Sequence, residues 1–298
     1  MYESFLKDKE YAVGVSPKTM IYLRNMGSKH FLPIIAPAKD EAELRKLVLE
    51  ATGRIQGLRR ARPGPGQSNE ITARSKNTYL GPLRTFLGWL LEEEIIVKAI
   101  RVKKLKVPRP LRKTLTFGQI VKLLDYKCTI KSRMFGIARI QAAVALMCDC
   151  GLRSSEWRNL KIADIDMDRR EVKVWGKGSI ERLVTFTPEC RKIVARWIRR
   201  LPERSVYAFP TSTGRPVSGR NALRDLVWLG ARCQIWHVNL HLLRHSFGTI
   251  WIRNGGSVEM LRRCMGHANI QTTLQYLHND TADMEAAHSQ FSPLSRMK

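Results

Sequence analysis

The sequence predicts a mainly α-helical protein of two domains, with a small antiparallel β-sheet in the second domain. Its 298 residues exceed the size of about 100–200 residues that is usual for one domain. Apolar residues recur at helical spacing through most of the chain, and the period shortens toward two only around residues 163–186. A basic, proline-interrupted stretch, RVKKLKVPRPLRK, separates the two helical parts.

The first predicted domain, residues 1–100, is expected to be all-helical. Ser16 followed by Pro17 marks a helix start, because serine caps helices and proline suits the first helical position. Further helices are predicted from Asp40 to Ile55 and from Thr72 to Glu93. Met20, Ile21 and Leu23 are apolar positions after the first of these starts, and in the second helix Leu44, Leu47, Val48 and Leu49 are expected to face inward.

Residues 101–114 are predicted to form a basic linker, and residues 115–298 the second domain. The linker is too rich in charge and proline for a packed helix. It is either a solvated connector or a strap that lies along phosphates. Thr116 with Gln119 offers a capping box at the start of the second domain.

The second domain is expected to combine long helices with one small sheet. An apolar helix from Met134 to Cys150 is predicted to end at Gly151, which suits the residue after a helix. Turn signals at DMDR and GKG divide residues 163–186 into antiparallel strands. Thr187 and Pro188 mark the start of another helix.

Charge is the strongest signal of a partner. The chain holds 52 lysines and arginines against 26 acidic residues, a net charge of +26. Such a chain needs a polyanion, and nucleic acid is the usual one; a membrane surface or a ribosome-type role are the alternatives. A membrane binder would concentrate its charge beside one amphipathic helix, whereas here charge runs through the whole chain.

The chain is expected to be cytoplasmic and free of the membrane. It has no run of eighteen apolar residues and no pattern of a signal peptide. Six scattered cysteines without CxxC spacing are expected to be reduced thiols in a reducing compartment.

Residues 239–278 gather most of the side chains that could carry chemistry. The stretch reads NLHLLRHSFGTIWIRNGGSVEMLRRCMGHANIQTTLQYLH. His241 and Arg244 are three residues apart and share one helix face, which suits an anion clamp with a proton carrier. His267 follows a glycine at a predicted helix end, and Tyr276 follows a Thr-Thr pair that suits the start of a short helix. A metal reading through His241 and His245 lacks the glutamate of the HExxH pattern.

Two further motifs precede this stretch. In GLRSSE, Arg153 opens a helix and could hold a phosphate, with Glu156 orienting it; an ordinary surface ion pair is the alternative. In WGKGS, Lys177 is at the tip of a predicted hairpin and could protonate a leaving oxygen, or it could be a plain turn lysine.

Taken in order, these motifs resemble the tyrosine recombinase (integrase) family over essentially the whole chain. GLRSSE, GKG, HLLRH, MGH and TTLQY follow the family's order, and MGHANIQTTLQYLH keeps its histidine-to-tyrosine spacing. The resemblance implies a helical core-binding domain and a mostly helical catalytic domain that together clasp duplex DNA. It favours the simple two-domain layout of Cre- and Xer-like members, without a separate arm-binding domain.

The resemblance also implies a role for each residue that matches a family motif. Tyr276 would attack the scissile phosphate and leave a 3′-phosphotyrosyl bond with a free 5′-hydroxyl. Arg153 and Arg244 would hold the non-bridging oxygens, and Lys177 would protonate the leaving 5′-oxygen. His241 would assist proton transfer.

Two supporting residues complete the implied site, and no cofactor is implied. His267 would hydrogen-bond the phosphate, and Glu156 would support Arg153. Neither metal nor ATP is required, because the phosphotyrosyl link keeps the energy of the broken diester.

The sequence departs from the family pattern at two places. Leu242 stands where an acidic residue is usual, so the helix start needs another cap, for which Asn239 is the candidate. Met265 stands where leucine is usual. Neither departure removes a catalytic atom.

The implied activity is site-specific DNA recombination by a homotetramer on two duplexes, through a Holliday junction. The segment Thr281–Phe291 is the candidate for docking between protomers. Two alternatives remain: a type IB topoisomerase-like enzyme, which usually has lysine where His241 stands, and a non-catalytic DNA-binding regulator.

Overall fold

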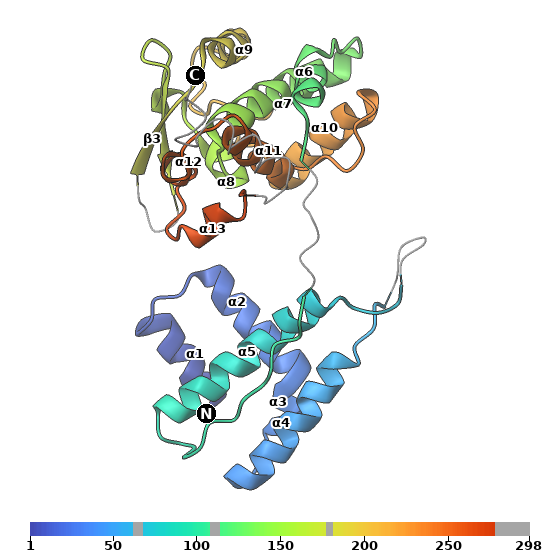
Figure 1. Ribbon diagram of the computed structural model, residues 1–298, viewed down its shortest axis with the longest axis vertical. Helices are drawn as coiled ribbons and strands as arrows, with labels where there is room; N and C mark the ends of the chain where they lie inside the picture. The colour runs from blue at the N-terminus through green and yellow to red at the C-terminus, as the bar shows by residue number, and fades with distance from the viewer. Residues whose placement is uncertain (62–67, 108–113, 177–180, 278–298) are drawn as a thin grey trace, which may run out of the picture. The chain divides into compact units, whose positions relative to one another are not determined.

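The chain folds into two compact units, Met1–Leu111 and Arg112–Lys298 (Figure 1). The computed structural model describes residues 1–61, 68–107, 114–176 and 181–277. The structure is mainly helical with one three-stranded antiparallel sheet, as the sequence predicts. No helix among the described residues has both the length and the apolar character to cross a membrane.

The first unit is all-helical. Its elements are α1 (Tyr2–Tyr11), α2 (Pro17–Met26), the π-helical turn η1 (Gly27–Phe31), α3 (Leu32–Ile35), α4 (Glu41–Gln56) and α5 (Ala73–Glu92). The helix starts at Ser16, Asp40 and Thr72 are confirmed, and each of these side chains accepts a hydrogen bond from the backbone three residues later.

An aromatic cluster fills the core of the first unit. The ring of Phe86 on α5 lies 5.0 Å from that of Tyr2 and 5.3 Å from that of Phe5, both in edge-to-face geometry. The Tyr2 hydroxyl donates to the Leu23 carbonyl oxygen, 2.8 Å away, so this buried phenol keeps a hydrogen bond. One expectation of an inward side chain was wrong, because Leu49 is exposed.

The first half of the basic segment lies along α5. Arg84 Nε donates to the Val102 carbonyl oxygen at 2.9 Å, and Asn77 exchanges two hydrogen bonds with the backbone of Leu105. These bonds hold the backbone of Val102 and Leu105 against α5 without helix or strand pairing.

The second unit holds eight helices within its described residues. They are α6 (Phe117–Asp125), α7 (Lys131–Cys150), α8 (Ser154–Asn159), α9 (Pro188–Ile198), α10 (Gly219–Arg232), α11 (Leu240–Arg253), α12 (Val258–Met265) and α13 (Gln271–Leu274). A single 3₁₀ turn, η2, spans Ile162–Asp164. The capping box of Thr116 with Gln119 and the Thr187–Pro188 helix start are confirmed.

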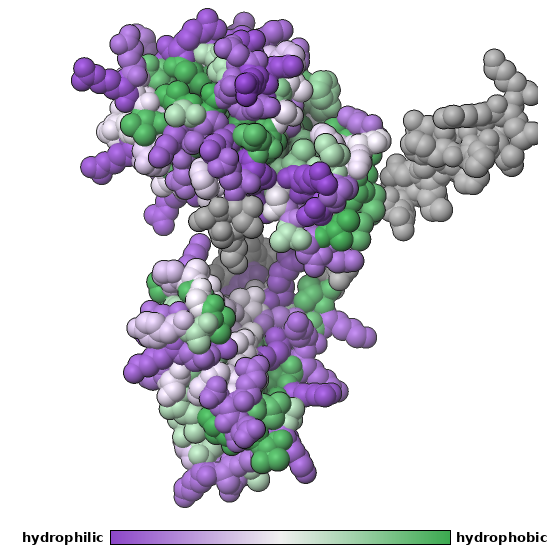
Figure 2. Space-filling view, turned by 90° about the vertical axis from the view of Figure 1, so that its left-hand side faces the viewer, coloured by the Kyte–Doolittle hydropathy of each residue, from purple (hydrophilic) through white to green (hydrophobic). Residues whose placement is uncertain are grey.

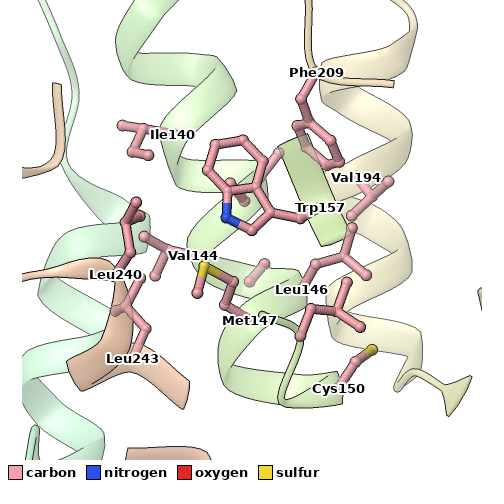
Figure 3. Close-up of a cluster of buried hydrophobic side chains, with 14 of the residues drawn as sticks. Ile140, Val144, Leu146, Met147, Cys150, Trp157, Val194, Phe209, Leu240 and Leu243 are labelled. Atoms are coloured by element: carbon pink, nitrogen blue, oxygen red, sulfur yellow. The ribbon is translucent and has the colours of Figure 1, made fainter. Parts of the chain in front are cut away.

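Helix α7 is the central element of the second unit, and α6, α9, α10 and α11 pack against it. Figure 3 shows its apolar side chains around Trp157 of α8, which is fully buried. The Trp157 ring meets Phe209 edge-to-face at 5.4 Å. Helix α7 ends at Gly151, as expected, in the left-handed conformation with φ of 63°.

The sheet of the second unit follows the predicted pattern. Strands β1 (Ile165–Asp166), β2 (Glu171–Trp175) and β3 (Glu181–Thr185) pair antiparallel in the order β1-β2-β3. Val172, Val174 and Val184 face the core. All six cysteines are free.

The visible face of each unit is largely covered by hydrophilic side chains, with apolar patches between them (Figure 2). This surface agrees with the large excess of lysine and arginine in the sequence.

Gly27 and Gly88 form a matched pair for testing the packing of the first unit. A Cβ at Gly27 would overlap the Tyr2 phenol, whereas a Cβ at Gly88, inside α5, would meet nothing within 4 Å. We expect Gly27→Ala to lower the free energy of unfolding by about 1–3 kcal/mol through overpacking. Gly88→Ala should raise it by about 0.5–1 kcal/mol through helix propensity. Urea unfolding followed by circular dichroism measures both, and equal effects of the two substitutions would contradict the packing described.

Candidate active site

The site begins at the turn between α7 and α8. Gly151 adopts positive φ, and a Cβ there would lie 2.5 Å from Cδ1 of Phe247 on α11. Only glycine therefore fits both the backbone and the packing of this turn. Arg153 follows as the N-cap residue of α8, which carries Glu156 in its first turn.

Glu156 is a buried carboxylate that holds Arg153 by two contacts. It accepts from the Arg153 backbone N–H at 2.6 Å and from Arg153 Nη1 at 2.9 Å. The other terminal nitrogen of Arg153 donates to the Gly266 carbonyl oxygen at 2.7 Å. The expected pairing of Glu156 with Arg153 is thus present, and it ties α8 to the turn after α12.

Arg182 on β3 is a second partner of Glu156 that the sequence analysis missed. Its two terminal nitrogens donate to the two carboxylate oxygens of Glu156 at 2.9 and 2.8 Å, and its Nε donates to the Cys264 carbonyl oxygen at 3.0 Å. The available signal was strand alternation, since Arg182 is two residues before the buried Val184 and so points inward.

The pKa of Glu156 reflects these partners. Burial raises the pKa of this carboxyl, but hydrogen bonds from Arg182 and Arg153 outweigh burial and lower it to about 2. Glu156 is therefore ionised throughout the physiological range.

Arg244 is buried on α11 and reaches three acceptors. It donates to the carbonyl oxygens of Gly151 at 2.5 Å and Met265 at 2.7 Å, and its Nη2 lies 2.9 Å from His267 Nε2. Burial, followed by the charge of Arg153, lowers the pKa of Arg244 to about 10. The guanidinium therefore stays cationic at neutral pH.

His267 is held as a neutral imidazole of one tautomer. A guanidinium has no acceptor, so Nε2 of His267 must accept from Arg244, and the proton must be on Nδ1. Nδ1 then donates to the Thr273 hydroxyl oxygen, 2.9 Å away on α13. Thr273 is fully buried and was not singled out from the sequence. Burial, and then the charges of Arg244, Arg153 and Arg182, lower the pKa of His267 to about 4.

Tyr276 is 4% exposed and its ring is stacked in parallel with His267, with centroids 6.5 Å apart. The ring of His245 is tilted relative to the Tyr276 ring, with the two centroids 5.6 Å apart. A Cβ at Gly248 would lie 2.8 Å from Cε1 and Cζ of Tyr276, so the absence of a side chain there makes room for the phenol. Tyr276 comes two residues after the end of α13, and the Thr-Thr pair lies inside this helix rather than at its start.

His241 is the remaining expected site residue that the structure describes. His241 is exposed in the first turn of α11, three residues before Arg244. Asn239 caps this helix by accepting from the Leu242 backbone N–H at 2.9 Å, which confirms the expected substitute for the missing acid. Lys177, His278 and the segment Thr281–Phe291 lie outside the described residues.

The assembled groups place a net positive charge beside a phenol. With His267 neutral, the cations of Arg153, Arg182 and Arg244 face the one carboxylate of Glu156, which leaves a net charge of +2 among the described side chains named here. The side chain of Arg153 is 33% exposed and that of Arg182 only 12%. An incoming anion can therefore reach Arg153 most directly.

Comparisons with known proteins agree on one family. A sequence profile of the phage integrase family matches residues 113–283. The tyrosine recombinase XerC of Psychromonas ingrahamii is 30% identical over 237 residues, covering 76% of this chain and 77% of its own length. XerC of Vibrio cholerae is 28% identical over 289 residues, covering 93% of this chain and 84% of its own length.

Solved structures show the same fold. The XerH site-specific recombinase bound to a palindromic difH substrate matches with a TM-score of 0.67 at 17% identity, covering 96% of this chain and 83% of that one. The Tn1549 transposon integrase in complex with transposon right end DNA matches with a TM-score of 0.68 at 16% identity, covering 96% and 97%.

The neutral state of His267 predicts a loss of stability in mild acid. The unfolded chain binds a proton at His267 near pH 6.5, whereas the folded protein binds it only near pH 4. Stability should therefore fall as the pH drops from about 6.5 to about 4, because the unfolded state binds more protons there. His267→Gln should flatten this part of the profile, as measured by urea unfolding at pH 7, 6 and 5. Profiles of the same slope in both proteins would contradict a buried neutral His267.

Proposed function

Since the chain belongs to the phage integrase family and is a tyrosine-type site-specific recombinase, we propose that Tyr276 cleaves DNA by forming a phosphotyrosyl bond. The observation that carries this proposal is the convergence of Arg153, Arg244 and His267 beside a buried tyrosine. These groups come from four separate segments of the chain and together supply a nucleophile and an anion site.

The proposed step is a transesterification. The Tyr276 oxygen bonds to the scissile phosphorus as the bond to the 5′-oxygen breaks, and the departing electron pair goes to that oxygen. A free tyrosine has a pKa of about 10, so the phenol needs a base and a cationic surrounding to react near neutrality. One phosphodiester replaces another, so rejoining is the reverse reaction with a 5′-hydroxyl as the attacking group.

Arg153 and Arg244 are proposed to bind the non-bridging oxygens as charge builds on them. Among the contacts of the described residues, Arg153 keeps three of its five N–H groups unused and Arg244 keeps two. Fixed cationic donors aimed at developing charge are usually the largest single contribution to catalysis. His267 supports this surface by accepting from Arg244, and because its Nδ1 donates to Thr273 it has no N–H left for the direct phosphate bond that the family resemblance implies.

Two roles rest more heavily on the family resemblance. Lys177 is proposed to protonate the leaving 5′-oxygen. His241 is proposed to assist proton transfer, and its exposed place one turn before Arg244 leaves it accessible to substrate.

Duplex DNA is the proposed partner, with four protomers acting on two recombination sites through a Holliday junction. The net charge of +26 supports a polyanionic substrate. The related XerH and Tn1549 integrase structures contain recombination-site or transposon-end DNA. Residues 1–100 are proposed to bind the core site, 101–114 to join the domains along phosphates, and 115–298 to carry the chemistry.

Trapping the covalent intermediate tests the proposal. Duplexes retained by the Tyr276→Phe variant would be selected from a random library and remade as a series with a nick at each position of the selected site. The wild-type protein should then form an adduct that survives denaturing electrophoresis, because the short fragment diffuses away and prevents rejoining. Tyr276→Phe should bind the same duplex and form no adduct.

The other outcomes of this assay are equally informative. An adduct that persists in Tyr276→Phe would contradict the assignment of the nucleophile. Binding without any wild-type adduct would favour a non-catalytic regulator. Relaxation of plasmids that lack paired sites would favour a topoisomerase-like enzyme.

Affinity for the selected duplex should fall steeply with salt. Each phosphate neutralised by lysine or arginine releases counterions, so six to ten contacts would lower affinity by about 10³–10⁵ between 50 and 200 mM salt. Fluorescence anisotropy over this range measures the slope. A slope corresponding to only one or two phosphates would contradict an extended basic DNA interface.

A further inference from the structure

Arg182 is the charged side chain of the site to which the proposed chemistry gives no role. It reaches Glu156 from β3, 26 residues along the chain, with both terminal nitrogens. Its side chain is 12% exposed and the Glu156 side chain 3%, so this pair is largely shielded from water. Charge interactions are stronger in such surroundings than at the surface.

The first effect of Arg182 is electrostatic. Glu156 also pairs with Arg153, and one carboxylate facing Arg153 alone would offset the charge that Arg153 offers to a phosphate. With Arg182 bound to the same carboxylate, the three groups carry a net charge of +1. Arg153, the most exposed of the three, can then act as a cation toward an incoming anion.

The second effect of Arg182 is mechanical. Its Nε donates to the Cys264 carbonyl oxygen, and a Cβ at Gly266 would lie 2.9 Å from its Nη1. The guanidinium therefore packs against the left-handed turn that presents His267. Arg153 binds the same turn through the Gly266 carbonyl oxygen. Arg182 thus sets the position of Arg153, a proposed phosphate ligand, and of the turn that carries His267, the partner of Arg244.

We propose that Arg182 is a positioning residue for strand cleavage: it neutralises Glu156 so that Arg153 stays available to the phosphate, and it fixes the turn that carries His267. This inference rests on the proposed function. The role proposed for Arg182 is carried by its bonds to Glu156 and Cys264 and includes no contact with the phosphate.

Single-turnover cleavage of the nicked duplex at saturating protein tests the proposal. Arg182→Met should slow adduct formation by about 100-fold, the scale expected for a misplaced catalytic group, with the Kd for DNA changed less than about 3-fold. Arg182→Lys should recover part of the rate, because it keeps the charge but loses the two-pronged contact. Arg191→Met, which breaks the exposed ion pair with Asp168, is the matched control and should cleave at the wild-type rate.

A double variant separates positioning from simple structural damage. In Arg182→Met, the negative charge of Glu156 remains and offsets the positive charge of Arg153. Glu156→Gln combined with Arg182→Met removes that charge, and should therefore cleave on the order of 10-fold faster than Arg182→Met alone. A double variant as slow as the single one or slower, or a rate loss matched by an equal loss of DNA affinity, would overturn the proposal.

A measurement on the DNA-free protein keeps this test independent of the proposed reaction. The imidazole resonances of His267 in a ¹H–¹⁵N spectrum should shift in Arg182→Met and stay unchanged in Arg191→Met. Unchanged His267 resonances in folded Arg182→Met would overturn the positioning role whether or not an adduct forms. If wild type forms no adduct but the His267 resonances shift in Arg182→Met, the result would contradict the proposed function. It would still support the positional link between Arg182 and His267.

Discussion

The site depends on one buried carboxylate shared by two arginines. An isolated charge at the depth of Glu156 would be strongly unfavourable, and breaking such a pair leaves an uncompensated charge behind. Arg153 approaches from the start of α8 and Arg182 from β3, so the carboxylate joins the helical layer to the sheet. Both arginines then reach the turn after α12 through the carbonyl oxygens of Gly266 and Cys264. The position of His267 follows from these bonds, and through His267 so does its contact with Arg244.

Around this carboxylate, the direction of each hydrogen bond is fixed. Arginine can only donate, so Arg244 obliges His267 to accept at Nε2, and the Thr273 oxygen then takes the proton on Nδ1. The same cations that order the imidazole also keep it neutral. Among the described side chains, the result is a cluster of arginines and one neutral imidazole, with a phenol stacked beside the imidazole. The positive charge of this cluster and the tautomer of His267 are therefore set by contacts within the fold.

Local signals made much of the fold predictable, and distant contacts explain what was missed. The caps at Ser16, Thr116 and Thr187 involve residues three apart, and Gly151 needs only its own positive φ, so one short window suffices for each. Arg182 and Thr273 act through side-chain contacts that spacing does not reveal. Ile21 and Leu49 are apolar residues next to buried positions of their helices, yet both are exposed. Helical spacing shows which residues share a face, but it does not show how wide the buried part of that face is. For the candidate site, motif order singled out segments that the structure brings together, while the hydrogen bonds between those segments needed three-dimensional coordinates.

The pairing of Val174 with Arg182 in the sheet has a consequence for how this sequence can vary. Side chains alternate along β3, so inserting or deleting one residue within the strand would turn Arg182 outward and bring Glu181 or Leu183 to the carboxylate. Strand β3 therefore tolerates exchange of its outer residues but not a change of length. The buried ion pair also constrains positions 156 and 182, because changing one residue alone leaves an unpaired charge. Sequences derived from this chain would therefore have to change both positions together.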